Sequence, residues 1–208
     1  MRWKFIFLLF LLLSTKPLSI FAQNIRHNFI STELGIGSMI IPENKRLLND
    51  RIPSIDLSYA RSMQNRSDEW IKKLHVSYQV ATLTYMNQRD LDGMLDTAAN
   101  SFGDVYMFTY SLMINLLGKE KNHLYLIPGW GIAYDTKTFF DDRSNIYIGS
   151  HFNYAIRVEG MYTRELTNKF LLLTGVKYMH YSNGSFILPN RGINSVTYKI
   201  GLAYQLSN

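Results

Sequence analysis

Apolar and polar residues alternate along most of the chain, and the alternation falls into eight segments separated by polar stretches. In the last segment, for example, Val196, Tyr198 and Ile200 alternate with Thr197 and Lys199. Successive side chains of a β-strand point to opposite faces, so alternation over ten or more residues predicts strands. The eight predicted strands are 28–40, 52–63, 71–85, 105–117, 123–135, 147–162, 169–181 and 194–206.

The polar faces of these strands indicate how the strands assemble. They are rich in Gly, Ser, Ala and Gln, and a barrel of eight strands has room inside only for side chains. We therefore expect the apolar faces to point outward, among them Leu74, Val76, Tyr78 and Val80 of the third strand. The prediction is an all-β fold, an eight-stranded antiparallel transmembrane β-barrel of outer-membrane type. A soluble lipocalin-like barrel, with its apolar face inside, is the alternative.

The connections between the strands support the membrane barrel. With the N-terminus in the periplasm, the periplasmic turns are short, and the outward loops are longer, which is the asymmetry of outer-membrane barrels. The turns are 64–70, 118–122 and 163–168, and the loops are 41–51, 86–104, 136–146 and 182–193.

The N-terminus has the features of a cleaved signal peptide over residues 1–22. Arg2 and Lys4 precede an apolar run over 5–13, and Ala22 provides a small residue at the cleavage site. A membrane-anchor helix is the alternative, but this run is too short to span ~30 Å of hydrocarbon. We expect residues 23–208 to form a single barrel domain.

Composition narrows the class of protein further. Aromatic residues make up 14% of the chain, which suits the aromatic girdles of a membrane barrel. No cysteine is present, which excludes disulfides and thiolate metal sites. The formal charge of +6 falls when Arg2, Lys4 and Lys16 leave with the signal, so it does not support a nucleic-acid partner. No cofactor or metal is expected.

Six charged residues share the inward parity of their strands. We interpret them as a buried charge network that fixes the barrel rather than as catalytic groups. They are Glu33, Asp56, Arg157, Glu159, Lys177 and Lys199.

The candidate chemistry lies at the outward end of the last two strands. His180 and Ser182 share the lipid-facing parity of their strand, and Asn194 begins the next strand at the same height. Polar side chains facing lipid are costly unless they are paired or functional. Ser182 would be a nucleophile activated by His180 as general base, with Asn194 orienting the imidazole.

The same segment supplies candidate oxyanion donors. These are the backbone N–H groups around Asn183 and Gly184 and the side chain of Asn190. Gly184 would leave space for an acyl chain or a tight turn. The alternative is structural, because Asn-Gly and Pro-Asn-Arg-Gly are turn signals without any catalysis.

The segment from Gly175 to Tyr204 resembles the C-terminal signature of the lipid A 3-O-deacylases, an outer-membrane acyloxyacyl hydrolase family. The residues that match the signature are His180, Ser182, Asn183, Gly184, Pro189, Asn190 and Gly192. The resemblance implies an eight-stranded barrel with its active site on the lipid-facing wall. It also implies hydrolysis of an ester-linked acyl chain of lipid A in the Gram-negative outer membrane. Lipopolysaccharide and membrane lipids are then the expected partners, and a homodimer is one alternative for the oligomeric state.

One departure from the family concerns the third member of the triad. The best-known members place a glutamate two residues after the turn glycine, where this chain has Asn194. An amide orients a histidine but does not stabilise its cation by charge. Asp141 and Asp142, in a neighbouring loop, are the other acidic candidates. The alternative function is therefore a non-catalytic barrel, structural or surface-binding, with a degenerate site.

Overall fold

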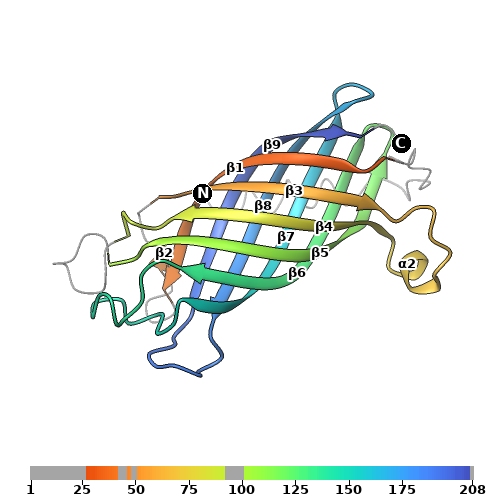
Figure 1. The fold of residues 1–208 in the computed structure, drawn as a ribbon. Helices are drawn as coiled ribbons and strands as arrows, with labels where there is room; N and C mark the ends of the chain where they lie inside the picture. Colours follow the sequence, from red (N-terminus) through yellow and green to blue (C-terminus); the bar gives the residue numbers. More distant parts are fainter. Residues whose placement is uncertain (1–26, 42–45, 48–50, 92–100, 207–208) are drawn as a thin grey trace, which may run out of the picture.

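The fold is a closed antiparallel barrel of eight long strands (Figure 1). The structure is a computed structural model that describes residues 27–41, 46–47, 51–91 and 101–206. The predicted signal peptide, 1–22, lies outside the described residues. The long strands are β1 (Phe29–Ile41), β3 (Ile52–Ser62), β4 (Val76–Asn87), β5 (Asp104–Lys119), β6 (Asn122–Asp135), β7 (Phe152–Glu165), β8 (Phe170–Ser182) and β9 (Ile193–Gln205).

Each long strand pairs with its neighbour in sequence, and the first pairs with the last. Strand β1 pairs with β9 from Phe29 opposite Gln205 to Ile40 opposite Asn194, which closes the sheet and leaves no long free edge. The two-residue strand β2 (Arg46–Leu47) pairs antiparallel with the C-terminal end of β1. The predicted fold class is therefore confirmed. Among the described residues, no helix is long and apolar enough to cross a membrane.

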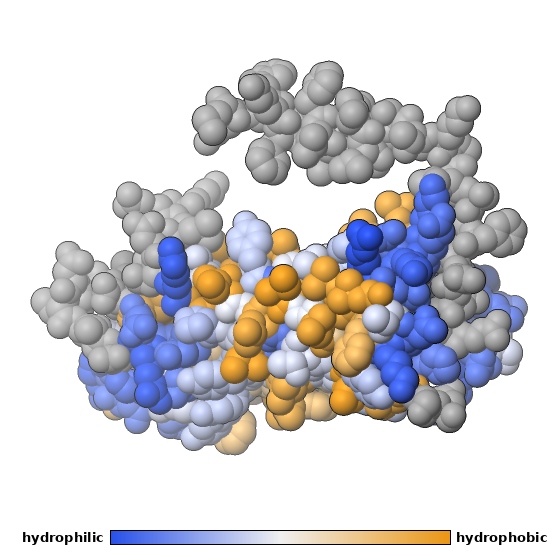
Figure 2. Space-filling view, turned by 90° about the horizontal axis from the view of Figure 1, so that it is seen from above, coloured by the Kyte–Doolittle hydropathy of each residue, from blue (hydrophilic) through white to orange (hydrophobic). Residues whose placement is uncertain are grey.

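The outward face carries the apolar band that the alternation predicts. Along β3, buried and exposed residues alternate strictly, with Ile55, Leu57 and Tyr59 exposed. Figure 2 shows hydrophobic side chains gathered over the middle of the barrel and hydrophilic ones toward both ends. This distribution matches a hydrocarbon layer around the middle and water at each end.

The third predicted strand, 71–85, begins too early and has the wrong parity. The helical turn α2 (Glu69–Lys73) occupies its start, and His75 has a positive φ of 53°. Strand β4 therefore begins at Val76, and Val76, Tyr78 and Val80 point inward, against the prediction. The sixth predicted strand, 147–162, likewise begins later, at Phe152, because 147–151 belong to the loop before β7.

The lumen is filled by side chains in three layers. Buried apolar residues form one cluster near the loop-bearing end, including Met86 and Tyr181, and another near the opposite end, including Phe29 and Tyr125. The six charged residues predicted to form a network have side chains that are almost fully buried. The inward face is therefore less uniformly small and polar than the sequence suggested.

The buried charges are joined in one network, as predicted. The Lys199 Nζ lies 2.8 Å from Glu33 Oε2, 2.8 Å from Asp56 Oδ2 and 2.9 Å from Glu159 Oε1. Lys177 pairs with Asp56 at 2.7 Å, and Arg157 pairs with Glu159. Three cations thus face three carboxylates, so the network is formally neutral.

Candidate active site

Strands β8 and β9 bring His180, Ser182 and Asn194 together on the outer wall. His180 and Ser182 are two residues apart and project to one side, and His180 pairs directly with Asn194 across the ladder. All three are partly exposed, whereas Tyr181, between the first two, is fully buried in the lumen. The three candidate residues therefore face outward, at the end of the barrel that bears the long loops.

The three side chains form a continuous hydrogen-bonded chain. The His180 Nε2 lies 3.3 Å from the Ser182 Oγ, and the His180 Nδ1 lies 2.9 Å from the Asn194 Oδ1. Because an amide oxygen only accepts hydrogen bonds, this contact places a proton on Nδ1. The Nε2 lone pair then faces the serine hydroxyl, which is the arrangement a general base requires.

A tyrosine that the sequence reasoning did not single out completes the chain. The Tyr178 hydroxyl donates to the Asn194 Oδ1 at 2.7 Å, so this oxygen accepts from both Tyr178 and His180. Tyr178 lies two residues before His180 on the same outward face. Strand parity alone places it next to the site, but a tyrosine at the membrane interface is ordinary and does not stand out.

Asn183 connects several parts of the loop after β8 through its hydrogen bonds. Its backbone N–H donates to the Asn190 Oδ1 at 3.0 Å, and its buried side-chain Nδ2 donates to the Ile187 carbonyl and the Ser150 Oγ. Gly184 follows in a left-handed conformation, with φ of 67°. A Cβ there would meet only the Phe186 ring, at 3.8 Å. Glycine is therefore favoured at this position by the left-handed backbone and not by lack of space.

Two candidate oxyanion donors remain available in this geometry. The Gly184 N–H has no hydrogen-bond partner within the described part of the chain. The Asn190 Nδ2 makes one long contact, 3.5 Å to the Ser185 Oγ.

Gly192 packs directly against the candidate dyad. A Cβ at this position would lie 2.8 Å from the His180 Cε1 and 3.2 Å from the Ser182 Cβ. Its φ of 71° is also left-handed, and its N–H donates to the Tyr147 carbonyl. Glycine is therefore required here by both conformation and space.

The acidic loop residues do not replace the missing acid. The Asp141 Oδ2 accepts from the Thr138 N–H and hydroxyl, both at 2.8 Å, and these bonds hold the pKa of Asp141 below its usual range. Asp142 accepts from Ser144, which likewise lowers its pKa. In the described part of the chain, the His180 Nδ1 bonds to Asn194 and not to either aspartate.

An amphipathic groove of about 780 Å³ lies beside Ser182. The strands β6 and β7 supply its apolar wall, and the loops supply polar groups at its mouth. Its lining includes Tyr134, Phe152, Tyr154, Asn183 and Phe186. Tyr154 pairs with Ser182 across the β7–β8 ladder, so the groove opens next to the serine.

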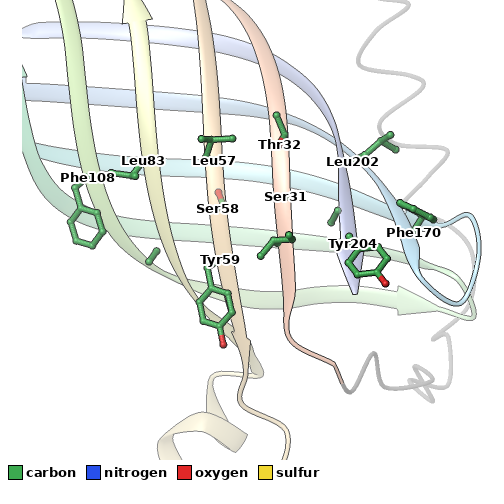
Figure 3. A pocket seen from close by; sticks show the side chains of 13 residues that line it. Ser31, Thr32, Leu57, Ser58, Tyr59, Leu83, Phe108, Phe170, Leu202 and Tyr204 are labelled. Atoms are coloured by element: carbon green, nitrogen blue, oxygen red, sulfur yellow. The ribbon is translucent and has the colours of Figure 1, made fainter. Parts of the chain in front are cut away.

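A second hollow, of about 570 Å³, lies elsewhere on the wall, away from the candidate residues (Figure 3). Its side chains come from β1, β3, β4, β5, β8 and β9, and they include Leu57, Phe108 and Tyr204. None of His180, Ser182 and Asn194 lines it, so we assign it no chemistry.

Comparison with known families gives one match. The model described as "Lipid A 3-O-deacylase (PagL)" matches residues 53–203, well over half of the chain. This range contains the whole of the candidate site. Comparison with curated proteins gave no significant match.

Solved structures with a similar fold include two outer-membrane proteins. Neisserial surface protein A has a TM-score of 0.56 and 9% identity, covering 86% of this chain and 97% of its own. The outer membrane enzyme PagL has a TM-score of 0.54 and 18% identity, covering 82% and 97%. Outer membrane protein H of P. aeruginosa has a TM-score of 0.52 and 15% identity, covering 86% and 99%. At these identities, the likeness concerns the fold alone.

Proposed function

Because this chain belongs to the lipid A 3-O-deacylase family, we propose that it is a serine esterase that removes an ester-linked acyl chain from lipid A. The chain is a protein of the Gram-negative outer membrane, and its barrel supplies the lipid-facing wall on which such an enzyme would work. The single observation that carries the proposal is the hydrogen-bonded chain from Ser182 through His180 to Asn194 on that wall.

The first half of the proposed reaction transfers the acyl chain to Ser182. The serine Oγ attacks the ester carbonyl carbon while its proton passes to the His180 Nε2, 3.3 Å away. Collapse of the tetrahedral intermediate breaks the bond to the sugar oxygen, and His180 returns the proton to that oxygen. The deacylated lipid A leaves as an alcohol.

The second half releases the acyl chain as a free acid. Water attacks the acyl-serine while His180 accepts one of its protons, and collapse returns that proton to the Ser182 Oγ. In both halves, the oxyanion needs nearby donors, and we assign this role to the Gly184 N–H and the Asn190 Nδ2. Asn183 would shape the loop that presents them, through its bonds to Asn190 and Ile187.

The location of the site fits a lipid substrate. His180, Ser182 and Asn194 face outward at the end of the barrel with the long loops, which in outer-membrane barrels is the extracellular end. A lipid A molecule in the outer leaflet would reach Ser182 by lateral diffusion, with an acyl chain against the apolar wall of the neighbouring groove.

The test is mass spectrometry of lipid A from a Gram-negative host that expresses the chain. We expect loss of one hydroxyacyl group with the wild-type protein, and no loss with Ser182→Ala or His180→Ala. Thr174→Ala is the matched control, because Thr174 lies on the same face of β8, away from the dyad. Heat-modifiable gel mobility would show that each variant has folded.

A non-catalytic barrel is the second candidate function, and the amide at position 194 is the observation that favours it. A folded wild-type protein that leaves lipid A unchanged would support this alternative and overturn the esterase proposal.

A further inference from the structure

The hydroxyl of Tyr178 and the imidazole of His180 share one acceptor, the Asn194 Oδ1, at 2.7 and 2.9 Å. Tyr178 lies opposite Val196 in the ladder, one diagonal step from Asn194, within the reach of a long side chain. We propose that Tyr178 is a positioning residue that holds the oxygen of Asn194, rather than its NH₂ group, against His180. This inference rests on the proposed esterase function.

The orientation of the amide decides whether His180 can act as a base. With the oxygen toward the ring, Nδ1 carries the proton and Nε2 offers a lone pair to Ser182. With the NH₂ group toward the ring, Nδ1 must accept, the proton moves to Nε2, and His180 no longer accepts the serine proton. A rotation of the Asn194 side-chain amide by half a turn therefore switches off the base.

A carboxylate at this position would not have this weakness. Both oxygens of an ionised carboxylate accept hydrogen bonds, so either orientation keeps the proton on Nδ1. An asparagine amide keeps the proton on Nδ1 only when its oxygen, and not its NH₂ group, points toward His180. A chain with Asn194 therefore needs a second group that distinguishes the amide oxygen from the amide NH₂ group.

Tyr178 has the chemistry to make this distinction. A phenol hydroxyl is a better donor than acceptor, so it favours the amide oxygen, whose two lone pairs accommodate both Tyr178 and His180. A second donor adds no negative charge to Asn194, so the effect of Tyr178 is on orientation and not on stabilisation of the imidazolium.

The first test reads the tautomer of His180 directly and needs no turnover. In protein labelled with ¹⁵N-histidine and folded in micelles, we expect the wild type to show a protonated Nδ1 and an unprotonated Nε2. The His180→Ala spectrum assigns the signal. Tyr178→Phe should move the population toward protonated Nε2, and Tyr198→Phe should not. Tyr198 is the matched control because it is exposed on the outward face of β9 and its hydroxyl makes no hydrogen bond within the described part of the chain.

The second test is a double-mutant cycle on the initial rate of lipid A deacylation. Tyr178→Phe should lower the rate by about ten-fold, the scale of one hydrogen bond, with little change in KM. In the background of Asn194→Asp, which has the same length but two accepting oxygens, the same change should cost several-fold less.

The outcomes separate this inference from the function on which it rests. An unchanged His180 tautomer in Tyr178→Phe, or equal losses of rate in both backgrounds, would overturn the role of Tyr178. An inactive wild type would overturn the esterase proposal, and the tautomer spectrum would then decide the role of Tyr178 by itself.

Discussion

Gly192 lies against His180 so closely that a methyl group on its α-carbon would come within 2.8 Å of the imidazole Cε1. The glycine comes from the end of the loop before β9, and the histidine from the end of β8. The loop that joins the last two strands therefore constrains the position of the imidazole.

Gly192→Ala should reduce deacylation strongly, by about a hundred-fold or more, because the new methyl group displaces His180 from Ser182. It should also destabilise the barrel by about 1–2 kcal/mol, the cost of a left-handed conformation for a residue with a Cβ. Initial rates and unfolding in urea measure the two effects. Gly184→Ala has nearly the same φ, but its Cβ would make only an ordinary contact with the Phe186 ring, so it should lose similar stability and less activity. Equal activity losses would contradict the steric account.

Asn194→Glu should preserve or raise the rate of deacylation. A carboxylate stabilises the imidazolium that forms when His180 takes the serine proton, and in a serine protease the reverse change, acid to amide, costs about 10⁴ in turnover. Asn194→Asp keeps the length of the present side chain and is the control for geometry. The measurement is the initial rate for the three proteins. A clear loss in both variants would contradict the triad geometry.

Asp56→Asn should destabilise the barrel by about 3–5 kcal/mol, because it leaves Lys177 and Lys199 with less compensating charge in the lumen. The free energy of unfolding in lipid vesicles measures this cost. The paired variant Asp56→Asn with Lys177→Met should recover part of the loss, since it restores formal neutrality. Activity of the folded fraction should remain near that of the wild type, because the network lies inside the barrel. If the single variant unfolds like the wild type, the charges do not stabilise the fold.

The turn at Thr138 should loosen in acid. The pKa of Asp141 is lowered in the folded protein by its bonds from Thr138, so the carboxylate stabilises the turn above the unfolded value, about 4. This contribution is lost as the pH falls through the folded pKa. Hydrogen exchange at the Thr138 amide should therefore speed up below about pH 4, beyond its intrinsic pH dependence. Asp141→Ala should abolish the extra change, whereas an unchanged profile in that variant would contradict the assignment.

The parity of the strands was sufficient to predict the barrel and the outward position of the site. His180, Ser182 and Asn194 lie in uninterrupted stretches of alternation, where each side chain's face follows from its neighbours. The six inward charges were predictable for the same reason, because a charge on the lumen parity must find partners.

Features that depend on irregular backbone were not predictable in this way. The helical turn α2 replaces the start of the predicted third strand, and Val76 and Tyr78 share the inward parity of Thr82 despite their apolar side chains. The bond from Tyr178 to Asn194 depends on a diagonal contact between two strands, which requires their register to be known. The loop contacts of Asn183 connect residues brought together only by the fold.

The filled lumen has a consequence for how reactants would travel. With apolar clusters at both ends and a neutral charge network between them, the described side chains fill the barrel interior. The water that hydrolyses an acyl-serine would therefore arrive from the cell exterior, over the loop rim. The liberated fatty acid would already lie in the outer leaflet, so substrate entry and product exit would share one two-dimensional route along the wall.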